Sequence, residues 1–284
     1  MRIPALSLPD CFTTHTENAI PLLPITAAQL PLWLNTQPAA VQQWVSRTEF
    51  TASADSFCLL PDEQGGISRV LYGIHPQIDL WSLSDAPTRL PSGRYQLETD
   101  WSDAQVFQVA LGWGLGAYQF TRYKAVTVKP VALVVAGETD RLSAQVAAIC
   151  RVRDLINTPP DDMMPPELAG ETKQLAARYG ATFSQIMGDD LLDENYPAIH
   201  AVGRASVHAP RLLQLTWGEP EHPRIALVGK GVCFDSGGLD LKPAKGMRYM
   251  QKDMGGAAHV LGLAELIMSA RLPVQLHVLI PAVE

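Results

Sequence analysis

The sequence predicts an α/β protein with two domains joined by a helix. With 284 residues and a hydrophobic content of 47%, the chain is long enough for about two domains. Beyond residue 160, helical and strand patterns alternate, which indicates a mixed, mostly parallel sheet covered by helices. A nearly all-apolar helix over 254–272 supports this prediction, because such a helix must be buried on most sides. We place a small N-terminal α/β domain at 1–138, and a linker helix (about 139–158) with a C-terminal α/β domain at 139–284.

The N-terminal domain has few long periodic runs. Its clearest helix covers 101–124 and begins at Ser102 or Asp103, and a strand is expected over 126–138. The sequence GWGLGAY at 112–118 imitates a dinucleotide-binding fingerprint, but it lies inside the helical pattern, so we interpret it as helix packing. In the linker helix, apolar residues recur at helical spacing, at Leu142, Val146, Ile149 and Val152.

The C-terminal domain alternates more regularly. A helix is expected over 165–180, where Gly180 ends it, and the apolar helix over 254–272 comes later. Strands are expected at 181–188, 212–218, 224–231 and 276–284.

Composition excludes several classes of protein. The net charge of -7 argues against nucleic acid as a partner, because nucleic-acid binders carry a basic surface. No run reaches the length of a membrane span, and the first residues lack the apolar core of a signal peptide. The cysteines form no CxxC pair, which favours a reducing, cytoplasmic location; they are Cys11, Cys58, Cys150 and Cys233.

Residues suited to metal chemistry gather between Gly229 and Gly256. Lys230 and Asp235 follow a predicted strand, and carboxyl ends of strands are the usual place for a site in α/β sheets. Asp253 stands at the head of the apolar helix, where negative charge is favoured. We therefore expect these carboxylates and amines to face one cleft.

The segment LDLK at 239–242 is expected to be extended. Leucines would then alternate with Asp240 and Lys242, so that Lys242 points away from the leucines. Gly237 and Gly238 would let the backbone turn sharply before this segment.

The same stretch allows other interpretations. The GKG sequence lacks the spacing of a phosphate-binding loop, and Gly231 replaces the hydroxyl that would hold magnesium. Met250 belongs to a helically spaced set with Met247 and Met254. It could therefore either pack in the hydrophobic core or line a substrate pocket. His259 has no partner at ligand spacing and is expected in the interior or at an interface, and Cys233 is expected to be a buried thiol.

The stretch GKGVCFDSGGLDLKPAKGMRYMQKDMGG resembles the signature of the leucyl aminopeptidase (cytosol aminopeptidase) family, which are two-metal exopeptidases. The segments RDLINTPPDDMMPPELA, AIHAVGRAS, LLQLTWG and LHVLIPAVE are also similar to that family, so the resemblance covers 151–284. It implies that 139–284 contains the linker helix and the first part of a metalloaminopeptidase catalytic domain.

The resemblance implies a role for each site residue. Lys230, Asp235 and Asp253 would be ligands of divalent metals, two Zn²⁺ or Mn²⁺ ions per full site. Lys242 would be a catalytic residue that polarises the substrate carbonyl, Asp253 would also bind the substrate amine, and Met250 would line the pocket for the first side chain. The implied substrates are peptides with a free N-terminus and a leucine-like first residue. A bicarbonate base and a homohexamer are further family properties.

The chain departs from the family in one respect. Family members continue to an NTDAEGRL-type motif with the remaining ligands, which this sequence lacks. The expectation is therefore a truncated chain that is inactive alone. The alternative is a non-catalytic binding or scaffold protein with the same fold.

Overall fold

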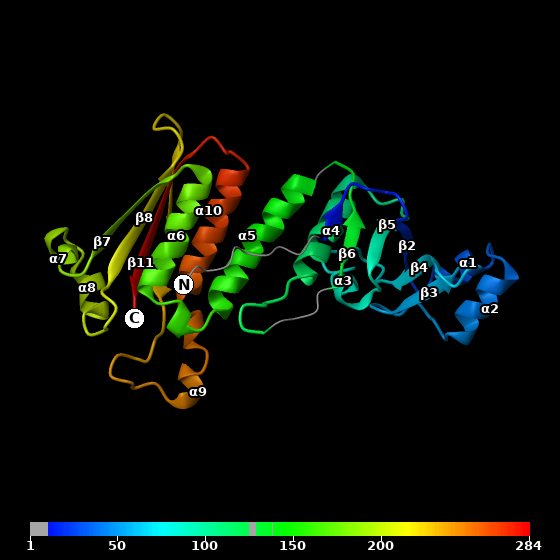
Figure 1. Ribbon diagram of the computed structural model, residues 1–284, viewed down its shortest axis with the longest axis horizontal. Helices are drawn as coiled ribbons and strands as arrows, with labels where there is room; N and C mark the ends of the chain where they lie inside the picture. Colours follow the sequence, from blue (N-terminus) through cyan, green and yellow to red (C-terminus); the bar gives the residue numbers. More distant parts are fainter. Residues whose placement is uncertain (1–10, 125–128, 138) are drawn as a thin grey trace. The chain divides into compact units, whose positions relative to one another are not determined.

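The computed structural model describes residues 11–124, 129–137 and 139–284. Contacts between residues divide the chain into two compact units, Met1–Val146 and Ala147–Glu284. Both are α/β units, which confirms the predicted fold class (Figure 1). Residues 126–128 and 138 of the strand expected at 126–138 lie outside the described residues. The division falls within helix α5 (Thr139–Asn157), whereas the sequence predicted a boundary at 138/139.

The N-terminal unit contains a six-stranded sheet in the order β1-β6-β5-β2-β4-β3. Its described strand pairs are parallel except for β3 with β4. The strands are β1 (Phe12–Thr13), β2 (Ile20–Ile25), β3 (Phe57–Pro61), β4 (Ile67–Gly73), β5 (Gly93–Leu97) and β6 (Val131–Val134). The helices are α1 (Leu30–Leu34), α2 (Ala39–Arg47), α3 (Ala86–Arg89) and α4 (Asp103–Gly116).

Helix α4 begins where the sequence predicted. Ser102 is its N-cap, and Gln105 completes a capping box that satisfies the first backbone N–H groups. Its glycines serve close packing: a Cβ at Gly112 would lie 1.6 Å from the carbonyl oxygen of Leu80. The interpretation of GWGLGAY as helix packing is therefore confirmed. The prediction that the helix reaches residue 124 is wrong, since it ends at Gly116, where a Cβ would meet the Ser84 carbonyl oxygen.

The C-terminal unit is built on a sheet with β11 at its centre. Strand β11 pairs in antiparallel fashion with β8 on one side and in parallel with β9 and β10 on the other. Strand β7 extends the sheet beyond β8. The strands are β7 (Thr182–Met187), β8 (Arg211–Trp217), β9 (Arg224–Val228), β10 (Gly231–Val232) and β11 (Gln275–Val283), so the four predicted strands are confirmed.

Helices α6 and α10 pack against this sheet and against each other (Figure 1). Gly180 ends α6 with a φ of 68°, a left-handed conformation that favours glycine. The face of α10 toward the sheet is apolar and buried, as the sequence predicted. The helical segments are η1 (Pro160–Asp162), α6 (Pro165–Tyr179), α7 (Asp190–Asp193), α8 (Pro197–Gly203), α9 (Ala244–Met247), η2 (Met250–Met254) and α10 (Gly255–Ser269). Within the described ranges, no helix combines the length and the apolar character needed to cross a bilayer.

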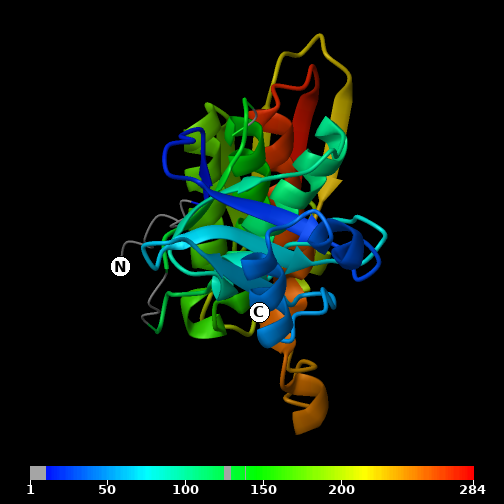
Figure 2. The same cartoon turned by 90° about the vertical axis from the view of Figure 1, so that its right-hand side faces the viewer.

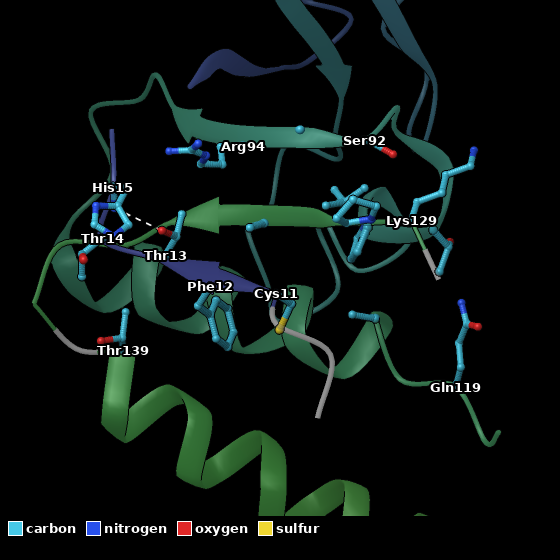
Figure 3. Close-up of a pocket in the computed structure, with 17 residues that line it drawn as sticks. Cys11, Phe12, Thr13, Thr14, His15, Ser92, Arg94, Gln119, Lys129 and Thr139 are labelled. Atoms are coloured by element: carbon cyan, nitrogen blue, oxygen red, sulfur yellow. Dashed lines mark hydrogen bonds between the residues drawn. The ribbon is translucent and has the colours of Figure 1, made fainter. Parts of the chain in front are cut away.

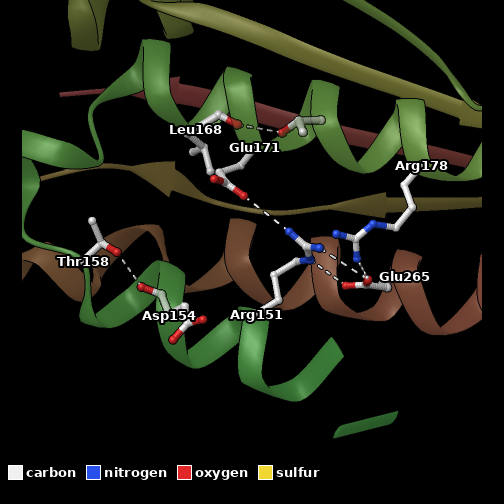
Figure 4. Close-up of polar contacts among 8 residues, drawn as sticks. Arg151, Asp154, Thr158, Leu168, Glu171, Arg178 and Glu265 are labelled. Atoms are coloured by element: carbon white, nitrogen blue, oxygen red, sulfur yellow. Dashed lines mark hydrogen bonds and ion pairs between the residues drawn. The ribbon is translucent and has the colours of Figure 1, made fainter. Parts of the chain in front are cut away.

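A buried cluster of charges links α5, α6 and α10 (Figure 4). Arg151 Nε lies 2.6 Å from Glu265 Oε2, and Arg151 Nη1 lies 3.3 Å from Glu171 Oε2. Arg178 Nη1 approaches Glu265 Oε1 at 2.9 Å from the edge of the cluster, with its side chain 50% exposed. Buried charges of this kind are tolerated only when they are paired. The cluster therefore fixes how α5 and α10 pack within the C-terminal unit.

Candidate functional site

The backbone at the end of β9 brings Lys230 against the start of α10. The N–H of Ala257 donates to the carbonyl oxygen of Lys230 at 2.9 Å. A Cβ at Gly256 would lie 2.8 Å from the Lys230 backbone nitrogen, so only glycine allows this approach without a shift. The sequence indicated close packing at Gly256 but not its partner, which is the Lys230 backbone.

The four charged residues singled out from the sequence form two ion pairs. Lys230 Nζ lies 2.7 Å from Asp253 Oδ2, and Lys242 Nζ lies 2.5 Å from Asp235 Oδ2. The pKa of Asp235 is lowered mainly by the Lys242 ammonium, with a smaller contribution from the Lys230 ammonium. The structure thus brings the four residues together as two pairs, and the expectation that all of them face one cleft stays a prediction.

The two pairs differ in solvent exposure. The Asp253 side chain is 12% exposed, whereas that of Lys230 is 58% exposed, so the amine covers the carboxylate from the solvent side. Asp253 Oδ2 is buried and accepts no hydrogen bond of normal geometry from the residues that the structure describes, which leaves the Lys230 ammonium as its partner among them. Lys242 Nζ also donates to Met250 Sδ at 3.1 Å, so Met250 lies beside the second pair.

A loop, not an extended segment, carries Lys242 to Asp235. Gly237 and Gly238 have φ values of 88° and 91°, and Asp240 also has a positive φ of 57°. The N–H of Lys242 donates to the Ser236 carbonyl oxygen at 3.0 Å, which closes the loop. The expected alternation along 239–242 is therefore wrong, because these left-handed residues break it. Figure 2 shows this loop and α9 projecting away from the sheet of their unit.

Hydrogen bonds hold Asp235 in its ionised form. The Lys242 ammonium lowers the pKa of Asp235, and the backbone N–H of Gly237, which donates to Oδ1 at 2.9 Å, lowers it further. A carboxylate that is ionised and oriented in this way is prepared to bind a cation.

The donor atoms suit a divalent metal as part of a coordination sphere. Two carboxylates and the amine of Lys230 are acceptable ligands for Zn²⁺ or Mn²⁺, and Asp253 Oδ2 already faces a cationic group, the Lys230 ammonium. In residues 11–124, 129–137 and 139–284, no three His, Cys, Asp or Glu side chains gather closely enough to hold a metal. The described residues therefore offer donor atoms that suit the expected metal, but these atoms are held in two ion pairs and not in one gathered ligand set.

Three neighbours lie outside the site. Met254 is fully buried in the core, which supports a core role for that methionine. Cys233 is 1% exposed and burial raises its pKa to about 12, so the prediction of a buried thiol is confirmed. His259 is exposed, not interior, and its Nδ1 donates to the Gly255 carbonyl oxygen at 2.6 Å.

Two family models match the chain. The catalytic domain of the cytosol aminopeptidase family matches residues 150–284, and the N-terminal domain of M17 aminopeptidases matches residues 20–136. A probable cytosol aminopeptidase of Rhodococcus opacus is 35% identical over 219 residues, which are 70% of this chain and 43% of that protein. A probable cytosol aminopeptidase of Leifsonia xyli is 35% identical over 246 residues, 80% of this chain and 49% of that protein. The chain thus spans less than half the length of these relatives.

Solved structures agree with the sequence matches. The cytosol aminopeptidase of Coxiella burnetii superposes with a TM-score of 0.93 at 43% identity, over 97% of this chain and 61% of that one. The bottromycin maturation enzyme BotP in complex with Mn has a TM-score of 0.75 at 28% identity, over 94% of this chain and 60% of that one. Both parts of this chain therefore belong to the cytosol aminopeptidase (M17) family.

Proposed function

We propose that this chain carries part of the active site of a metal-dependent aminopeptidase that removes leucine-like residues from the N-terminus of peptides. The observation that carries the proposal is the ion pair of Lys230 with Asp253, which joins the end of β9 to the segment before α10, together with the pair of Lys242 with Asp235 in the loop between them. The names of the relatives support the reaction class.

Lys230, Asp235 and Asp253 would hold a divalent cation. The Lys230 ammonium would give up its proton, and its amine and the Asp253 carboxylate would turn from each other toward the metal. Bound metal would supply an activated water and stabilise negative charge on the substrate oxygen. The solved complex of BotP with Mn supports a divalent metal of this kind.

Lys242 would act on the substrate, not on the metal. Its ammonium lies 2.5 Å from Asp235 Oδ2 and 3.1 Å from Met250 Sδ, so it contacts both a carboxylate and an apolar side chain. There it can donate to a peptide carbonyl oxygen and stabilise the charge that develops during hydrolysis. Met250 would contact the first side chain of the substrate, and Asp253 would accept from its α-amine.

A metal titration tests the site directly. Isothermal titration of the chain with Mn²⁺ or Zn²⁺ is expected to show a bound ion that Asp253→Asn weakens by at least about 100-fold, because an ionised ligand is lost. Lys173→Ala, on the exposed surface of α6, is the control and should leave the affinity within a few fold. Absence of binding by a well-folded chain would favour the alternative, a binding or scaffold protein.

Hydrolysis of leucyl p-nitroanilide tests the reaction. With only three donors we expect little turnover by the 284-residue chain itself. A fusion of this chain to the part of the Coxiella burnetii enzyme outside the match should show Mn²⁺- or Zn²⁺-dependent turnover. In that fusion Lys242→Met should lower kcat by at least about 100-fold with little change in metal affinity. If the fusion binds metal and Lys242→Met hydrolyses as fast as its parent, the role of Lys242 is refuted.

The remaining properties implied by the family are also proposals. A bicarbonate base, assembly into a homohexamer and a cytoplasmic location stay predictions. Light scattering of the purified protein measures the assembly.

A further inference from the structure

A pocket of about 970 Å³ opens in the N-terminal unit, far in sequence from the candidate metal site (Figure 3). Its size is within the range of small-molecule sites, roughly 300 to 1,000 Å³. It is bounded by β1, the starts of β5 and β6, α3, the segment after α4 and the first residue of α5. All these residues belong to one compact unit.

Strand register explains the hollow. Arg94 on β5 is paired with Ala132 on β6, and pairing partners in a parallel sheet point to the same face. Thr13 on β1 is paired with Val134, two residues beyond Ala132, and so joins this face. The small Ala132 side chain leaves space between Arg94 and Thr13. The next residues on the strands point the other way, into the core.

The described lining is basic and polar. It contains Arg94, Lys129 and His15 together with several hydroxyl groups, and none of its described residues is Asp or Glu. This contrasts with the whole chain, which has 29 acidic residues and a net charge of -7. In the described part of the chain, the side chains of Arg94 and Lys129 make no hydrogen bond or ion pair. Among the described residues of the lining, cations without an acidic partner create a positive potential that attracts anions.

The polar groups lie at two ends of the pocket. Figure 3 shows Arg94, His15 and Thr13 at one end, while Lys129, Ser92 and Gln119 lie at the other. Gln119 Oε1 is buried and has no hydrogen-bond partner among the described residues, so it can accept from a hydroxyl group of a ligand but not from the ionised group itself. We propose that this pocket binds an elongated organic anion with a phosphate or carboxylate group at each end. One end would be held by Arg94 and the other by Lys129.

Calorimetry with probes of different charge tests the proposal. Protein is stripped of metal, freed of chelator and titrated with fructose 1,6-bisphosphate, fructose 6-phosphate and adipate. The bisphosphate should bind at least about tenfold more tightly than the monophosphate, because both ends are engaged. Binding of adipate in place of the bisphosphate would assign the carboxylate form of the ligand. If no probe binds, or if both sugar phosphates bind equally, the two-ended site is wrong.

Substitutions show whether binding occurs in this pocket. Arg94→Ala and Lys129→Ala should each weaken bisphosphate binding by at least about tenfold, since each removes a charged hydrogen bond. Ala132→Glu, which places a carboxylate on the partly exposed floor, should abolish binding. Lys173→Ala, on exposed α6 surface, is the control and should bind like the parent. Unchanged affinity in Arg94→Ala and Ala132→Glu, with native circular dichroism, would overturn the proposal. The metal site takes no part in these measurements.

Discussion

Replacing Arg151 with methionine should greatly loosen the C-terminal unit. The arginine side chain is 5% exposed and contacts Glu265, which is 2% exposed, through Nε at 2.6 Å and Nη2 at 3.4 Å. Methionine fills a similar volume but carries no charge, so Glu265 loses its main buried partner. Removing one member of a buried ion pair costs about 3 to 5 kcal/mol. Since Arg178 remains 2.9 Å from Glu265, we expect the lower value, about 3 kcal/mol.

Hydrogen exchange read by mass spectrometry measures this loss within the unit. Peptides from α10 should exchange about 100-fold faster in Arg151→Met, because about 1.4 kcal/mol corresponds to tenfold. Arg178→Met is the matched control: its side chain is half exposed, so a loss of about 1 kcal/mol or less is expected.

A triple variant separates charge from packing. This variant removes the buried charges together, by combining Arg151→Met with Glu171→Leu and Glu265→Met. It should recover most of the free energy of unfolding that Arg151→Met loses, since apolar replacements of buried ion pairs are often neutral or stabilising. If the triple variant exchanges as fast as Arg151→Met alone, the loss comes from packing. The reasoning from unpaired charge is then refuted.

Three further predictions concern glycines and a thiol. Gly112→Ala should lower the melting temperature, because its Cβ would collide with the Leu80 carbonyl oxygen. A Cβ at Gly170 would meet nothing within 4 Å, so Gly170→Ala should stabilise α6 by about 0.5 to 1 kcal/mol, as measured by urea unfolding. Gly256→Ala should push α10 away from Lys230 and so weaken Mn²⁺ binding, measured by calorimetry. Gly255→Ala is the control and should bind Mn²⁺ normally, because a Cβ there would make only an ordinary contact at 3.7 Å. Equal Mn²⁺ affinities of the two variants would contradict the proposed geometry. Burial raises the pKa of Cys150 to about 11, so at pH 8 its thiolate should be about 100-fold scarcer than that of a thiol of pKa 9. Iodoacetamide should therefore label Cys150 only after the protein is unfolded, and peptide mass spectrometry measures this labelling.

Local signals predicted the elements well but not the loops between them. The capping sequence at Ser102 and the positive φ of Gly180 depend on neighbouring residues, so the sequence alone located those helix ends. The end of α4 depends on a distant partner, the Ser84 carbonyl oxygen against which Gly116 packs. The path of 239–242 depends on the left-handed conformation of Asp240, which the sequence does not predict.

The sequence singled out the charged residues of the candidate site but did not predict how they pair. Its charged residues lie within one stretch of sequence and resemble a family signature. Which amine meets which carboxylate is decided by the loop before Lys242 and by the packing of α10 on Lys230. The Arg151 cluster was not predicted, because Arg151 and Glu265 are 114 residues apart and no local pattern relates them.

The central place of β11 also sets an order of assembly. Strands β8 and β9 do not pair with each other, and each is hydrogen-bonded to β11, which lies about 50 residues or more further along the chain. Strand β9 therefore has no described strand to join until β11 has formed, and such long-range pairing is slow because a large loop must close first. Lys230 lies two residues beyond the end of β9, so its contact with Asp253 is expected to form after β9 has paired with β11. Any folding intermediate that contains only the β7 and β8 pair would lack the metal site.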